Sequence, residues 1–129
     1  MRLALVCAGL CLLGAGPAIA AELANQPGSR LLELCRPVAS GPPASGLPAS
    51  DERLRADTCL AFIDGFVWGH AWASWREAKD MWFCLPEDFL PEQGARDVVA
   101  YLSAHPDRLD EDSHLLVFLA LTAAYPCKP

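Results

Sequence analysis

The sequence lacks the short motifs that mark the common hydrolases, phosphate-binding proteins and metal sites. It has no Gly-x-Ser-x-Gly, no glycine-rich phosphate loop and no His-x-x-x-His pair. Histidine itself is scarce, with His70, His105 and His114 far apart in the chain. Their ordinary roles there are core packing, a helix C-terminus and a helix first turn. We therefore expect no catalytic centre, no metal and no cofactor, and interpret the protein as a non-enzyme.

Positive charge is also in short supply. The chain has 10 Lys and Arg against 16 Asp and Glu, which gives a formal net charge of −6 at pH 7. A surplus of acid disfavours binding to the phosphates of nucleic acids and to anionic lipids. We therefore expect neither a nucleic-acid partner nor a membrane partner for the processed protein.

The first twenty residues are typical of a secretory signal peptide. A positive charge at Arg2 precedes an uncharged apolar run over residues 3–15 and an Ala-x-Ala pattern that ends at Ala20. The apolar run is shorter than the roughly 18–20 residues that cross a bilayer, which argues against an anchor. We predict cleavage after Ala20 and export of residues 21–129 to the bacterial periplasm. Cleavage removes one basic and no acidic residue, so the net charge changes from −6 to −7.

Two of the six cysteines lie in the predicted signal peptide. Those that remain are Cys35, Cys59, Cys84 and Cys127. An even number in a short exported chain indicates disulfides, whereas a four-cysteine zinc site would need close Cys-x-x-Cys pairs. Paired cysteines leave no thiol for nucleophilic catalysis. Four cysteines allow three pairings, among which the sequence does not decide; we favour Cys35–Cys59 and Cys84–Cys127.

Apolar periodicity, helix-start signals and prolines predict four helices. We place them at about residues 30–39, 51–78, 91–104 and 111–124. A linker rich in Pro and Gly, over residues 40–49, separates the first two helices. The chain shows no alternating strand pattern and no internal repeat. We therefore predict an all-α fold, a small disulfide-stapled bundle of about four helices in a single domain.

The second predicted helix is apolar on two sides. Trp68, Trp72 and Trp75 fall together on the face opposite the predicted core face. We favour a central helix packed from both directions, and the alternative is a dimer or partner surface, because aromatic anchors dominate interfaces. The last predicted helix is apolar nearly all round, which predicts a place in the middle of the fold.

Several segments between residues 59 and 127 carry a resemblance to a known family. They are residues 59–69 (CLAFIDGFVWG), 84–87 (CLPE), 98–106 (VVAYLSAHP), 116–117 and 120–127 (ALTAAYPC). A Cys-x-Pro, a His-Pro and an aromatic-Pro-Cys signal follow one another in this order. The sequence resembles the Rap/Tai immunity family, small periplasmic helical proteins associated with type VI secretion.

The resemblance implies a function and a partner. Proteins of this kind bind a peptidoglycan amidase toxin delivered by sibling cells, block its Cys–His active site and often form homodimers. Between the third and fourth predicted helices lies an acidic connector, whose carboxylates are Asp107, Asp110, Glu111 and Asp112. We interpret the connector as the candidate toxin contact and the tryptophan face as the candidate dimer face. For the connector, helix capping and solvation are the competing interpretation.

Two other functions are consistent with a small acidic helical protein stapled by disulfides. The first alternative is a periplasmic acid-protective chaperone, which exposes apolar surface when its excess carboxylates lose their charge at low pH. The second is a saposin-like lipid binder, but such proteins usually have three disulfides and this mature chain has cysteines for two. We rank the chaperone second and the lipid binder third.

Overall fold

The computed structural model describes residues 26–41, 49–77 and 81–127. Its helices are α2 (Gly28–Ser40), α3 (Ser50–Glu77), α4 (Pro91–Ala104), the 3₁₀ turn η1 (Pro106–Arg108) and α5 (Ser113–Ala124). No strand occurs in these ranges, so the all-α class and the four predicted helices are confirmed. The predicted signal peptide and most of the predicted linker lie outside the described residues.

Local chemical signals explain where the helices begin. Asp51 and Glu52 stand in the first turn of α3, where a negative charge is favoured by the helix dipole. Pro91 occupies the first position of α4, where the proline ring fits and no backbone N–H is missed. The Asp112 side chain caps the N-terminus of α5. These signals act over one turn, so they could be read from the sequence.

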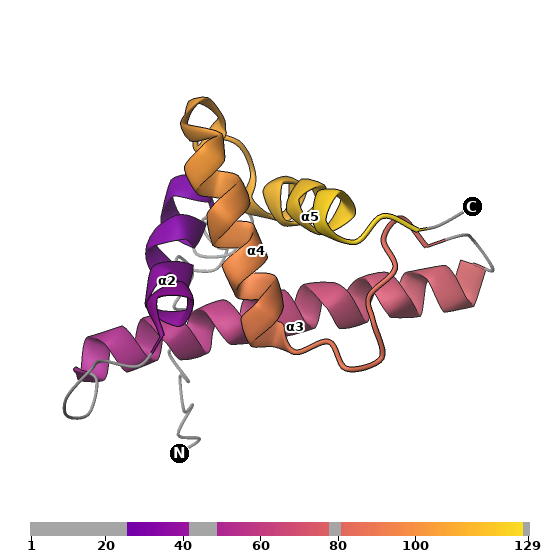
Figure 1. The fold of residues 1–129 in the computed structure, drawn as a ribbon, viewed down its shortest axis with the longest axis horizontal. Coiled ribbons are helices and arrows are strands. Elements are labelled where there is room, and N and C mark those ends of the chain that lie inside the picture. The colour runs from indigo at the N-terminus through magenta and orange to yellow at the C-terminus, as the bar shows by residue number, and fades with distance from the viewer. Residues whose placement is uncertain (1–25, 42–48, 78–80, 128–129) are drawn as a thin grey trace, which may run out of the picture.

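The longest helix, α3, is the base of the fold. Figure 1 shows α2 and α4 crossing its N-terminal half and α5 lying beyond α4. The contacts agree with this view, since α2 packs against both α3 and α4, and α4 packs against α5. The C-terminal part of α3 extends past α2 and α4, and residues 81–90 lead from there to α4.

The core lies where α2, α4 and α5 meet the first half of α3. Its most fully buried side chains are Phe83, Ile63, Leu102, Leu116, Leu121, Val98, Val117, Cys35 and Cys59. Burying one large apolar side chain of this kind stabilises the fold by roughly 1.5–3 kcal/mol. Phe83 comes from the segment after α3, which shows that this segment is packed onto the bundle.

Both favoured disulfides are present. Cys35–Cys59 joins α2 to α3 and is fully buried, with a sequence separation of 24. Cys84–Cys127 joins the segment after α3 to the chain beyond α5, with a sequence separation of 43. Loops of these lengths correspond to about 3–4 kcal/mol each in the chain-entropy model. The two bridges therefore staple different parts of the molecule.

Two packing expectations are wrong. The tryptophan face of α3 is not covered, because Trp68, Trp72 and Trp75 are 64%, 63% and 74% exposed. Nor is α5 enclosed on all sides, since Leu115 is 44% exposed. The physical reason is size, because a domain this small buries a limited share of its surface and its helices cannot surround one another. An apolar face is thus left uncovered on α3, and one large apolar side chain is left uncovered on α5.

Candidate partner-binding surfaces

The acidic connector follows α4 at the end of that helix that points away from α3 (Figure 1). It starts at His105, which closes α4, and continues through η1 to Asp112. The His105 ring stacks on Tyr101 with centroids 4.2 Å apart, and its Nδ1 lies 2.8 Å from the Tyr101 carbonyl oxygen. This contact fixes the point at which the chain leaves α4.

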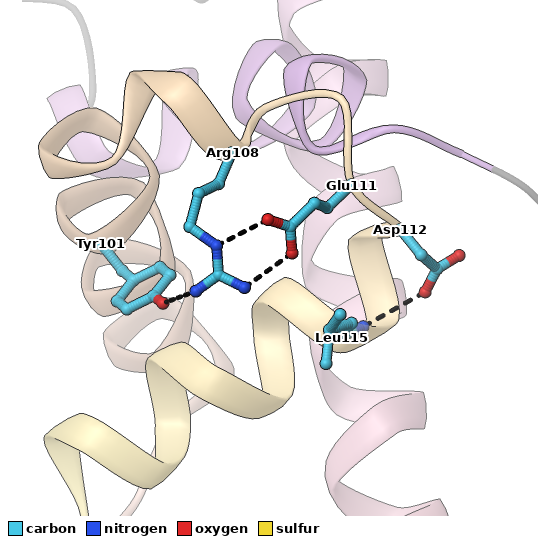
Figure 2. A network of polar contacts seen from close by, with 5 residues as sticks. All are labelled: Tyr101, Arg108, Glu111, Asp112 and Leu115. Carbon is cyan, nitrogen blue, oxygen red and sulfur yellow. Dashed lines mark hydrogen bonds and ion pairs between the residues drawn. The ribbon is translucent and has the colours of Figure 1, made fainter.

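Arg108 holds the centre of the connector (Figure 2). Its Nε and Nη2 donate to the two carboxylate oxygens of Glu111 at 2.7 and 2.6 Å, and its Nη1 donates to the Tyr101 hydroxyl at 2.9 Å. Such a bidentate arrangement is the strongest form of an arginine–carboxylate pair. The bonds to Arg108 lower the pKa of the Glu111 carboxyl, and those to Glu111 raise the pKa of Arg108.

Asp112 ends the connector by capping α5. Its Oδ1 accepts from the backbone N–H of His114 at 2.9 Å and from that of Leu115 at 3.2 Å. A cap of this kind contributes about 1 kcal/mol to helix stability. Figure 2 shows the Asp112 cap beside the Arg108 network, so both ends of the turn are tied down.

The connector is also bonded along its backbone to the start of α2. Gly28 N donates to Glu111 O, Ser29 N to Leu109 O, and Ser113 N to Gln26 O, each at 2.9 Å. A Cβ at Gly28 would lie 2.2 Å from the Cδ1 of Leu116, so glycine allows this close approach. Sequence reasoning missed this pairing, because nothing in the periodicity connects two segments some eighty residues apart.

The four connector acids therefore differ in what they contact. Glu111 is held by Arg108 and Asp112 caps α5. Asp107 and Asp110 are exposed, and within the described ranges neither carboxylate has an ion-pair or hydrogen-bond partner. The structure thus separates two carboxylates that shape the connector from two that are open to a partner.

The tryptophan face lies on the exposed side of α3 and consists of Trp68, Trp72 and Trp75. The rings of Trp72 and Trp75 are 5.1 Å apart between centroids and inclined at 54°. Contiguous exposed apolar side chains of this size are uncommon on monomeric proteins and mark contact surfaces.

The three histidines are separated by the fold. His70 stacks on Phe83 with ring centroids 4.2 Å apart, and burial lowers its pKa. His105 closes α4, and His114 stands in the first turn of α5, 3.3 Å from Asp112. Among the residues that the structure describes, no group of three or more His, Cys, Asp or Glu is placed to hold a metal ion. None of the helices described is both long and apolar enough to span a bilayer.

Comparison with known proteins identifies a family for this chain. A family model for Rap1a immunity proteins matches residues 27–127. No curated protein and no solved structure matches the chain. The matched range includes the helices α2 to α5, the Cys35–Cys59 and Cys84–Cys127 disulfides, the connector and the tryptophan face. It starts well before residue 59, where the resemblance noted in the sequence begins, so α2 is part of the family's domain.

Proposed function

The chain belongs to the Rap1a immunity protein family. We propose that it is a periplasmic immunity protein that inhibits a peptidoglycan amidase toxin of the type VI secretion system. Membership of the family indicates protection against a secreted toxin by binding, and not catalysis. The observation that carries the proposal of amidase inhibition is the structure of the connector. This polar turn is held by hydrogen bonds on several sides and still presents two carboxylates without a partner, Asp107 and Asp110.

The way the connector is held suits inhibition by insertion of the connector into the active site of the toxin. A loop that is already ordered loses little conformational freedom when it binds, so more of the contact energy appears as affinity. Asp107 and Asp110 would accept hydrogen bonds from basic groups of the toxin, and such complementary charges speed association and fix orientation. Glu111 and Asp112 would act indirectly, by keeping the turn in shape.

The tryptophan face supports the second part of the proposal, a homodimer. Trp68, Trp72 and Trp75 offer the large aromatic area that dominates stable interfaces. It lies on α3, whereas the connector follows the end of α4 that points away from α3 (Figure 1). A dimer formed through this face would leave both connectors free to bind a toxin molecule.

The disulfides support the proposed compartment. Two bridges close loops in a chain of 129 residues, and such bridges persist in oxidising compartments such as the periplasm. The exported protein would meet a cell-wall amidase where that enzyme acts. We propose that the first twenty residues are removed on export.

Inhibition of purified amidases tests the proposal. The mature chain should stop peptidoglycan hydrolysis by one Cys–His amidase of type VI secretion at a stoichiometric ratio. Asp107→Lys with Asp110→Lys should weaken inhibition at least tenfold, and Glu87→Lys, an exposed acid on residues 81–90, should leave it unchanged. No inhibition of any such amidase, together with protection of unrelated proteins from aggregation in acid, would support the chaperone instead.

A further inference from the structure

Trp82 belongs to neither of the two surfaces described above. It is 67% exposed, and its ring meets the ring of Phe118 edge to face, with centroids 5.9 Å apart. On the same helix as Phe118, Leu115 is 44% exposed and Leu119 is half-buried. Side chains three or four residues apart on a helix are neighbours. These side chains therefore form one apolar patch, the Trp82 patch, which consists of Trp82, Leu115, Phe118 and Leu119.

The chain holds Trp82 in place on its C-terminal side. The backbone N–H of Trp82 donates to Nε2 of His70 at 3.4 Å. The next residue, Phe83, is fully buried, and its ring stacks on His70 with centroids 4.2 Å apart. Cys84 follows and is bound to Cys127. Because its backbone is anchored in this way, Trp82 loses little conformational freedom when its exposed ring is bound.

The Trp82 patch is uncharged and borders the acidic connector. Neither residues 81–86 (MWFCLP) nor α5 contain Asp, Glu, Lys or Arg. The connector ends at Asp112, whose Oδ1 accepts from the N–H of Leu115 at 3.2 Å (Figure 2). Protein interfaces have a middle that is rich in aromatic side chains and poor in charge, surrounded by a polar rim. The patch and the connector together have this composition.

One partner surface can cover the connector and the Trp82 patch at the same time. Six residues of α5 separate Asp112 from Phe118, a rise of about 9 Å along the helix axis. An interface of ordinary size buries about 800 Å² on each partner, which is wide enough for both features. A molecule that reaches the connector therefore lies next to the patch.

The Trp82 patch is separated from the tryptophan face by the body of α3. His70, which contacts Trp82, stands two residues from Trp68 and two from Trp72. At about 100° per residue, His70 lies on the opposite side of the helix from both tryptophans. A second copy of the chain that covers the tryptophan face therefore leaves the Trp82 patch open.

We propose that the Trp82 patch is the apolar half of the toxin contact. This inference rests on the proposed function and adds to it the chemistry of the partner surface. That surface carries basic groups for Asp107 and Asp110 and, beside them, an apolar depression that takes the indole of Trp82. The connector guides and orients the toxin, because charges at a rim act mainly on association. The patch retains the toxin, because a buried aromatic anchor acts mainly on dissociation.

Binding kinetics with the amidase that the mature chain inhibits test the proposal. Surface plasmon resonance at low and at high salt gives the two rate constants. Trp82→Ala should raise the dissociation rate at least tenfold and leave the association rate and its salt dependence unchanged. Asp107→Lys with Asp110→Lys should instead slow association, most strongly at low salt. Leu90→Ala is the matched control, because Leu90 is 61% exposed at the far end of residues 81–90 and should change neither rate.

Leu115→Ser is a second variant of the patch. Its N–H still bonds Asp112, so the circular dichroism should be unchanged while the dissociation rate rises by a smaller factor than in Trp82→Ala. Amidase binding with an unchanged dissociation rate in both variants would overturn this proposal alone. Loss of the dimer in Trp82→Ala, measured by sedimentation, would assign the patch to a second copy and overturn it as well. A wild-type chain that binds no Cys–His amidase would refute the proposed function, and this inference with it.

Discussion

The connector and the tryptophan face differ in how strongly the rest of the chain holds them in place. The connector is bonded to α4, to the start of α2 and to α5, and its geometry is set inside the chain. The tryptophan face has three large rings held by a helix backbone and left open to solvent. A turn that is shaped in advance suits a specific charged contact, and an open apolar face suits burial against another large surface.

The largest expected effect is a loss of unfolding free energy on removal of a disulfide. The two disulfides should affect the connector differently, because they hold different parts of the molecule. Cys35–Cys59 holds α2, whose first residues bond the connector, so Cys35→Ala with Cys59→Ala should cost about 3–4 kcal/mol of unfolding free energy. Hydrogen exchange at the Gly28 and Ser29 amides should also become faster. Denaturant unfolding and exchange mass spectrometry measure the two effects.

Removal of the other bridge provides the comparison. Cys84→Ala with Cys127→Ala should cost a similar free energy but leave the amides of Gly28 and Ser29 protected. Because Cys84 is exposed and Cys35 is fully buried, mild reductant should open Cys84–Cys127 first. Equal loss of protection in both double variants would contradict the separation of the surfaces.

A smaller effect is expected at Gly28. An alanine there would place its Cβ 2.2 Å from Leu116, so Gly28→Ala should destabilise the protein by roughly 1–3 kcal/mol through overpacking. Gly69 lies on α3 with nothing within 4 Å of a Cβ, so Gly69→Ala should stabilise by roughly 0.5–1 kcal/mol. Urea unfolding of the two variants should give opposite signs, and the same sign for both would refute the close contact.

The smallest expected effect is a pH dependence at the connector. Arg108 holds the pKa of Glu111 below its ordinary value of 4.5, so the pair stabilises the fold above that value. This contribution should be lost as the pH falls through the lowered pKa. Glu111→Gln should flatten that part of the profile of unfolding free energy between pH 7 and 3, and Glu87→Gln should not. An unchanged profile in Glu111→Gln would show that the pair adds no stability.

Some features could be predicted because their causes are local. Pro91 and Pro106 mark the bounds of α4 by chain geometry alone, and the even number of mature cysteines indicated two bridges. The pairing of Gly28 with Glu111 could not be predicted, because it depends on how α2 meets the far end of α4. The exposure of Trp72 could not be predicted either. Periodicity identifies an apolar helix face, but it does not tell whether the same chain or another molecule covers that face.

Calorimetric titration of the cognate amidase, combined with sedimentation analysis, tests the division of roles between the two surfaces most directly. We predict that Asp107→Lys with Asp110→Lys weakens amidase binding at least tenfold and keeps the dimer. Trp68→Ser with Trp72→Ser should give a monomer that still binds the amidase. Amidase binding that survives the aspartate changes and is lost with the tryptophans would contradict this division of roles between the connector and the tryptophan face.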